Sequence, residues 1–247
     1  MITKNELEEY AKLRGMKNIG HAEKDYFQSI LLFVVYQNYG SEIVFKGGTA
    51  LSKCFGLNRF SEDLDFSCKD EVNFQAVAEG LKRFRIEFET EEDSFERSRS
   101  WIVRIKGPLF NGNRNSYCKV KLDFSFREKT EIKPVIKSIG RFLEEIPSFD
   151  VYVMSEEEIF AEKIRAVMTR NKARDVYDLY FLAEKGVKLN KTLAEKKLEY
   201  YSRRFDLKEF AKALKEKKSI WKSELSGLIE NVPDFTGAVQ RIMKAVK

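Results

Sequence analysis

Apolar and polar residues alternate along two stretches of the chain, residues 59–67 and 119–126. Successive side chains of a β-strand point to opposite faces, so a period of two predicts a strand with one buried and one polar face. Residues 42–46 form a further predicted strand. Residues 87–106 and 117–126 are predicted to form two or three antiparallel strands.

Helical patterns lie between and after these strands. Residues 3–6 have the form of a capping box, an apolar-rich helix follows over about 21–38, and Asp70 is expected to cap another helix. After residue 154 the pattern is helical throughout, beginning with a second capping box at 155–158.

The order of these elements predicts an α+β fold. We expect a mixed sheet flanked by helices over residues 1–154 and a C-terminal helical domain over residues 155–247.

Composition places the chain among folded proteins. Of its 247 residues, 43% are hydrophobic, and the longest apolar run, residues 30–36, is far too short to cross a bilayer. The acidic N-terminus lacks the apolar segment of a secretory signal, and three widely spaced cysteines match neither a zinc motif nor a disulfide framework. We therefore expect a cytoplasmic protein with reduced thiols and no membrane association. A single histidine, His21, argues against histidine-based catalysis.

The net charge of +6 is unevenly placed along the chain. Residues 1–150 contain equal numbers of basic and acidic side chains, so the excess lies in residues 151–247. Such an asymmetry accompanies polyanionic partners such as RNA, and it equally fits a solvated lysine-rich helical surface. The candidates for RNA contacts lie in a basic run over residues 208–222: Lys208, Lys212, Lys215, Lys217, Lys218, Trp221 and Lys222.

Three aspartates carry the candidate chemistry. Asp63 and Asp65 share one face of the first alternating stretch, and Asp123 lies on the polar face of the second. Three carboxylates on strands anchored in the core suit Mg²⁺, a hard cation that prefers oxygen ligands. The alternative is that Asp63 and Asp65 cap a turn or face solvent. Gly47 and Gly48 come shortly before them, where a strand ends and a helix begins, and glycines there let the backbone approach a phosphate.

This order of strand, Gly-Gly-Thr, short helix, Asp-x-Asp strand and later strand aspartate resembles the polymerase-beta superfamily of nucleotidyltransferases. A longer match resembles the AbiEii/AbiGii toxin family, through residues 45–52 (FKGGTALS), 59–67 (RFSEDLDFS), 158–166 (EIFAEKIRA) and 172–180 (KARDVYDLY). The resemblance implies a nucleotidyltransferase-like sheet followed by a helical domain. It also implies a toxin of a toxin–antitoxin or phage-defence pair, with a cognate antitoxin, that uses nucleoside triphosphates; some members of the family modify tRNA.

Two-metal catalysis assigns a role to each carboxylate. Two ions clamp the attacking and leaving oxygens of an in-line displacement. We expect Asp63 and Asp65 to bridge both Mg²⁺ ions, and Asp123 to bind the ion nearer the attacking hydroxyl. The triphosphate would lie on Gly48 and Thr49, and pyrophosphate would leave.

Basic residues near these motifs are candidates for phosphate binding. Lys163 borders the apolar stripe of its predicted helix, where it either reaches a triphosphate or packs its stem with the ammonium in water; the family resemblance favours phosphate. Arg165 is a further candidate. Asp175 and Asp178 lie on one helix face, so either can pair with Lys163 or Arg165 and position it, while Asp175 alternatively complements a helix N-terminus. Lys46 either faces the nucleotide or is a surface charge at a strand end.

The sequence thus predicts transfer of a nucleoside monophosphate to a hydroxyl, at an RNA or tRNA 3′ end. Two alternatives stay open. One is transfer to a protein hydroxyl or to the enzyme itself, with Ser61 and Ser67 as candidate targets. The other is a catalytically silent protein whose basic helical domain holds RNA or a partner, and three clustered carboxylates argue against it.

Overall fold

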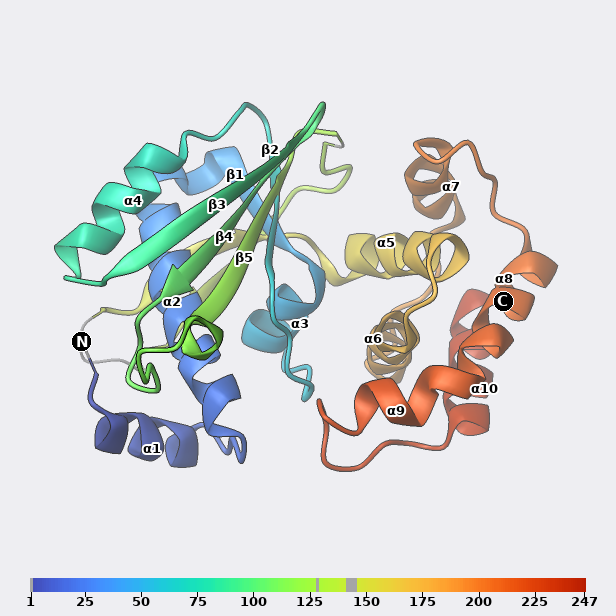
Figure 1. Cartoon of the computed structure of the whole chain (residues 1–247). Coiled ribbons are helices and arrows are strands. Elements are labelled where there is room, and N and C mark those ends of the chain that lie inside the picture. Colours follow the sequence, from blue (N-terminus) through green and yellow to red (C-terminus); the bar gives the residue numbers. More distant parts are fainter. Residues whose placement is uncertain (1, 128, 141–145) are drawn as a thin grey trace. The chain divides into compact units, whose positions relative to one another are not determined.

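The chain, seen in a computed structural model that describes residues 2–127, 129–140 and 146–247, forms two compact units (Figure 1). The first unit comprises Met1–Ala50, Glu62–Lys129 and Pro134–Val153, and the second comprises Leu51–Ser61, Thr130–Lys133 and Met154–Lys247. Two short segments that the sequence pattern assigned to the N-terminal domain, 51–61 and 130–133, therefore pack with the helical second unit.

The first unit is built on a mixed sheet. Among the described residues it has seven strands: β1 (Ile43–Lys46), β2 (Leu64–Cys68), β3 (Phe88–Phe95), β4 (Ser98–Ile105), β5 (Cys118–Ser125), β6 (Val135–Ile139) and β7 (Phe149–Val153). Their order is β3-β4-β5-β2-β1-β7-β6. Strand β2 runs parallel to β5, and β1 runs parallel to β7, whereas the other neighbours are antiparallel. The mixed sheet with its helices confirms the predicted α+β fold class.

Three longer helices of the first unit begin at polar caps: α1 (Lys4–Leu13), α2 (Ile19–Tyr39) and α4 (Phe74–Arg83) (Figure 1). The predicted capping box forms, because the Thr3 hydroxyl accepts from the Glu6 N–H while the Glu6 carboxylate accepts from the Thr3 N–H. The predicted cap at Asp70 is wrong. The side chain of Asn73 accepts from the Gln75 N–H instead, so α4 starts three residues later in the chain.

Core packing fixes which face of the central strands is polar. Leu64 and Phe66 of β2 and Leu122 and Phe124 of β5 are fully buried. The rings of Phe66 and Phe124 stack with centroids 4.9 Å apart. Side chains alternate along a strand, so the aspartates between these residues point to the opposite face.

The second unit is helical, as predicted. Its helices are α5 (Glu156–Thr169), α6 (Ala173–Glu184), α7 (Lys191–Glu199), α8 (Leu207–Glu216), α9 (Trp221–Leu225) and α10 (Phe235–Val246), while α3 (Gly47–Phe55) begins in the first unit and ends in the second. No described helix has both the length and the apolar composition needed to span a bilayer.

The second predicted capping box forms only in part. The Ser155 hydroxyl accepts from the Glu158 N–H at 3.2 Å. The Glu158 carboxylate turns away from the cap and accepts from the N–H groups of Glu131 and Ile132, and it pairs with Lys197 at 2.7 Å. This buried carboxylate attaches segment 130–133 to the second unit.

Candidate active site

Strand register brings two of the three aspartates side by side. In the parallel pair formed by β2 and β5, Asp65 lies directly opposite Asp123. Residues paired in this way present their side chains on the same face of the sheet. Asp63 precedes β2 by one residue and lies two positions from Asp65. All three side chains are half-buried.

An ammonium group lies among these carboxylates. Lys121, two residues before Asp123 on β5, pairs with Asp123 at 3.0 Å, and the Ser100 hydroxyl donates to the same carboxylate. Burial alone would lower the pKa of Lys121, but the hydrogen bond and charge of Asp123, together with the charges of Asp63 and Asp65, raise it above the ordinary value. The charges of all three aspartates therefore favour the protonated form of Lys121. The sequence analysis had not identified Lys121 as part of the site.

The donor set suits a hard divalent ion. As the side chains stand, no three His, Cys, Asp or Glu residues in the described part of the chain are gathered tightly enough to hold a metal. The Lys121 ammonium is nevertheless a cation that pairs with Asp123 and is stabilised by the charges of Asp63 and Asp65, and carboxylate oxygens are the ligands that Mg²⁺ prefers. The residues present therefore fit the ion.

The glycine turn abuts the carboxylates. Gly47 has φ +76°, a conformation that side chains disfavour, and a Cβ at this position would overlap Oδ2 of Asp65. Only glycine therefore lets the start of α3 lie against the Asp65 carboxylate. This contact joins the two motifs that the sequence had linked by spacing alone.

Thr49 uses its hydroxyl inside the protein. Its side chain is 1% exposed, and Oγ1 donates to the backbone carbonyl of Asp63 at 2.5 Å. A phosphate contact by Thr49 would therefore come from its backbone N–H. Lys46 is half-buried and lies opposite Asp65 in the register of β1 with β2.

A second charged cluster lies within the helical unit. Lys163 of α5 is buried and pairs with Asp175 at 2.9 Å and with Asp178 at 2.7 Å. The sequence left open whether Asp175 or Asp178 pairs with a basic residue, and whether that residue is Lys163 or Arg165. In the structure both aspartates pair with Lys163. Arg165 instead places its guanidinium over the ring of Tyr201, 4.8 Å from the centroid.

Two arginines extend this cluster. Arg59 donates from Nε and Nη2 to the two carboxylate oxygens of Asp178 at 2.6 and 2.8 Å, and both side chains are almost fully buried. Arg170 makes the equivalent paired contact with Asp175 at 2.7 and 2.8 Å. The result is an alternating chain of charges, Arg59–Asp178–Lys163–Asp175–Arg170, in which cations outnumber carboxylates.

The ion pairs favour the charged forms of Lys163 and of both aspartates. Burial would raise the pKa of both aspartates. Lys163 and Arg170 nevertheless hold the pKa of Asp175 well below its usual range, and Arg59 and Lys163 lower the pKa of Asp178. Burial would likewise lower the pKa of Lys163, and the two aspartates raise it. The cluster therefore carries an excess positive charge that suits an anionic ligand.

The basic run at residues 208–222 is partly structural. Lys217 is buried and donates to the carbonyl of Val167 at the end of α5, at 2.9 Å. Trp221 is also buried, and its indole N–H donates to the carbonyl of Pro233. These two residues are therefore not available as RNA contacts, whereas the other lysines of the run are exposed.

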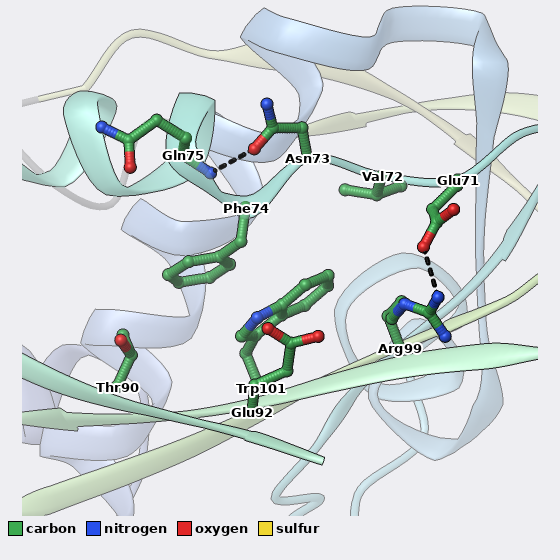
Figure 2. A pocket seen from close by; sticks show the side chains of 9 residues that line it. All are labelled: Glu71, Val72, Asn73, Phe74, Gln75, Thr90, Glu92, Arg99 and Trp101. Atoms are coloured by element: carbon green, nitrogen blue, oxygen red, sulfur yellow. Dashed lines mark hydrogen bonds and ion pairs between the residues drawn. The ribbon is translucent and has the colours of Figure 1, made fainter. Parts of the chain in front are cut away.

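A pocket of about 440 Å³ lies elsewhere in the first unit, between the start of α4 and strands β3 and β4 (Figure 2). Figure 2 shows the stacked rings of Phe74 and Trp101, with Arg99 paired to Glu71 at one end. Trp101 follows Ser100, whose hydroxyl contacts Asp123, and neighbouring residues of a strand face opposite sides. The pocket thus opens on the sheet face away from the aspartates.

Comparison with known proteins identifies the family to which the chain belongs. A family described as nucleotidyl transferase AbiEii toxin, type IV toxin–antitoxin system, matches residues 30–245. The nucleotidyltransferase toxin MenT4 from Mycobacterium tuberculosis H37Rv has the same fold, with 22% identity over 99% of this chain and 88% of its own, and a TM-score of 0.69. JHP933 from Helicobacter pylori is 23% identical over 91% of this chain and 89% of its own, with a TM-score of 0.62. No curated protein sequence matches the chain. The chain belongs to the AbiEii nucleotidyltransferase toxin family of type IV toxin–antitoxin systems.

Proposed function

We propose that the protein transfers a nucleoside monophosphate from a nucleoside triphosphate to a hydroxyl of RNA, at a tRNA 3′ end, with two Mg²⁺ ions. The observation that carries the proposal is the register of β2 with β5, which sets Asp65 beside Asp123 on the polar face of the sheet. Asp63 adds a third carboxylate two residues away.

The carboxylates have separate tasks in this scheme. Asp63 and Asp65 would hold the ions, and Asp123 would hold the ion nearer the acceptor hydroxyl and favour release of the hydroxyl proton to water. When bound, the ions supply the positive charge that stabilises the attacking and leaving oxygens. The acceptor oxygen forms a bond to the α-phosphorus, the bond from that phosphorus to the bridging oxygen breaks, and pyrophosphate leaves.

The chain also offers donors to the triphosphate. Backbone N–H groups at the start of α3, from Gly48 and Thr49, suit phosphate oxygens because they have no partner within the helix. Gly47 keeps this turn close to Asp65, and Lys46 precedes it. We assign these residues to the nucleotide.

Lys163 is proposed to neutralise phosphate charge. Asp175 and Asp178 fix its ammonium from two sides, which lowers the entropy lost on binding an anion. The excess positive charge of the cluster supports this role, while Arg165, which stacks on Tyr201, is assigned a contact with the acceptor or nucleotide only by resemblance.

RNA is the favoured acceptor because of the charge of the second unit. Exposed lysines of the basic run, Lys208, Lys212, Lys215 and Lys218, suit a polyanion. For the alternative, self-modification, Ser67 is a poor target because its side chain is buried, which leaves Ser61. A catalytically silent protein disagrees with membership of a nucleotidyltransferase family. We propose a cytoplasmic location for this reaction, because nucleoside triphosphates and tRNA are its proposed substrates, and the antitoxin would act in the same compartment.

Incubation with each α-labelled nucleoside triphosphate, Mg²⁺ and total tRNA tests the proposal. We expect label on RNA, loss of transfer in EDTA, and at least about a hundredfold slower transfer for Asp63→Asn. Asp93→Asn, the same change on exposed strand β3, is the matched control and should transfer normally. Label on the protein alone would favour self-modification, and transfer by Asp63→Asn at the normal rate would contradict the assigned site.

A further inference from the structure

Asp63 lies just before the first paired residue of β2. Pairing of β2 with β5 starts at Leu64, and pairing with β1 starts at Asp65. Asp65 is therefore a paired residue of the sheet on both sides, whereas Asp63 lies at the end of the pairing. Contacts from other elements thus bear on the position of residue 63, whose carboxylate is to act together with that of Asp65.

Two buried side chains hold the peptides around Asp63. Nε2 of Gln28, on α2, donates to the carbonyl of Glu62 at 2.8 Å. Oγ1 of Thr49, on α3, donates to the next carbonyl, that of Asp63, at 2.5 Å. Each of these two side chains is only 1% exposed. Successive carbonyls are thus each held by a different helix.

The position of Gln28 is unusual for a polar residue. Its neighbours on α2 include Phe27, Ile30 and Leu31, all fully or almost fully buried. A buried amide is costly unless it forms hydrogen bonds, and an apolar side chain would suit this part of α2 better on stability grounds alone. The hydrogen bond to the Glu62 carbonyl offsets the cost of burying the Gln28 amide. Lys24, one turn earlier on α2, also contacts the Glu62 carboxylate, at 3.4 Å.

Thr49, on α3, likewise holds a carbonyl next to the Asp63 side chain. A hydroxyl that is buried and already donates to a protein carbonyl is poorly placed to bind a phosphate oxygen. Its hydrogen bond links the first turn of α3, which follows the glycines, to the peptide that carries Asp63.

We infer that Gln28 and Thr49 are positioning residues, which together direct the Asp63 carboxylate toward the metal ions. This inference rests on the proposed function, because it requires Asp63 to be a metal ligand. It assigns the Thr49 hydroxyl to the protein and leaves phosphate binding at this turn to backbone N–H groups.

The test compares donor-deleting variants with conservative ones in the full chain. Gln28→Met keeps the length and apolar stem of the side chain, and Thr49→Val keeps its shape, while both lose the donor. Thr49→Ser restores the hydroxyl. Thr90→Val and Gln75→Met make the same changes at exposed positions and serve as controls. Mn²⁺ binding by electron paramagnetic resonance without nucleotide is the first readout, and the Mg²⁺ dependence of transfer is the second.

We expect Gln28→Met and Thr49→Val each to weaken Mn²⁺ binding at least fivefold, with transfer recovering at high Mg²⁺ and with Thr49→Ser close to the wild type. A purely structural defect would not be rescued by metal. If either variant fails to fold by circular dichroism, the other decides the question.

Two results separate failure of this inference from failure of the proposed function. If Asp63→Asn abolishes Mn²⁺ binding while folded Gln28→Met and Thr49→Val bind normally, the positioning role is wrong and the metal site stands. An increase only in the KM for the nucleotide with Thr49→Val would likewise overturn the inference, since it would make the hydroxyl a phosphate ligand. If the wild type binds no Mn²⁺ that depends on Asp63, the proposed function itself fails.

Discussion

Replacement of Arg59 by methionine tests the buried chain of charges in the second unit. Arg59 makes two hydrogen bonds, at 2.6 and 2.8 Å, to a carboxylate that has no exposed surface. The variant keeps an unbranched apolar stem but leaves Asp178 without its guanidinium partner. The free energy of unfolding of the second unit is the quantity that should change.

The size of the stability loss depends on the burial of Asp178 and on the ion pair that Asp178 keeps with Lys163. Removing one partner of a buried ion pair costs about 3–5 kcal/mol, because the other charge is left without compensation. Lys163 still pairs with Asp178 at 2.7 Å, so we take the lower end, about 3 kcal/mol. For a chain of this size that loss corresponds to a fall of about 6–12 °C in melting temperature.

Urea and thermal unfolding followed by circular dichroism measure the effect. Arg104→Met is the matched control, since Arg104 pairs with Glu91 on the surface and such pairs contribute about 0–1 kcal/mol. Adding Asp178→Asn to Arg59→Met should recover part of the loss, because the uncompensated charge is removed. A loss below about 1 kcal/mol, equal to that of the control, would refute the buried pairing.

Three further predictions concern acid stability, the glycine turn and the thiols. Because folding lowers the pKa of Asp175 and Asp178, their contribution to stability is complete above the unfolded value of about 3.9 and is lost as the pH falls through the folded values; urea unfolding between about pH 4 and 2 should show this loss, and Asp178→Asn should flatten it. Gly47→Ala should slow nucleotidyl transfer at least about a hundredfold while α5–α10 stay folded by circular dichroism, because the new methyl group would overlap the Asp65 carboxylate that we propose as a metal ligand; normal transfer would contradict the contact. Burial raises the pKa of Cys68 and Cys118 to about 12, so neither thiol should react with a disulfide reagent at pH 8 until the protein is unfolded, and rapid native labelling of either would show the packing to be wrong.

Local patterns predicted the elements of the fold well. Alternation along residues 119–126 identified the buried and polar faces of β5, because a strand's side-chain period depends only on its backbone. Thr3 and Glu6 form their capping box because both partners lie within one helical turn. The helical pattern after residue 154 corresponds to helices α5 to α10.

The misses depend on partners distant in sequence. Glu158 leaves its expected cap because the N–H groups of segment 130–133 and Lys197 lie within reach only in the fold. Arg59 was visible in the sequence, but its partner Asp178 lies 119 residues away, so no local period marks the pair. One signal was present: Asp175 and Asp178 share a helix face and so indicated paired cations, for which the sequence analysis considered only Lys163 and Arg165.

Partners distant in sequence also explain why the roles expected of Thr49 and Lys217 differ from their contacts in the structure. Thr49 follows two glycines, which suggests a phosphate ligand. Its hydroxyl instead donates a hydrogen bond to the carbonyl of Asp63, which lies near Thr49 only in the folded chain. Lys217 lies in a basic run and was a candidate for RNA contact or for a solvated surface, but its ammonium donates to the carbonyl of Val167. Spacing identified the chemistry of each segment, and tertiary contacts decided how each side chain is used.

Metal specificity at Asp123 tests the central claim, that β2 and β5 together present carboxylates to the catalytic ions. A thiolate is a poor ligand for Mg²⁺ and a good one for softer ions. Asp123→Cys should therefore lose transfer in Mg²⁺ by at least about a hundredfold and regain much of it when Mn²⁺ or Cd²⁺ is added, whereas Asp93→Cys should behave as the wild type with every ion. Full activity of Asp123→Cys in Mg²⁺ would contradict the account, since the residue beside Asp65 would then have no part in holding the metal.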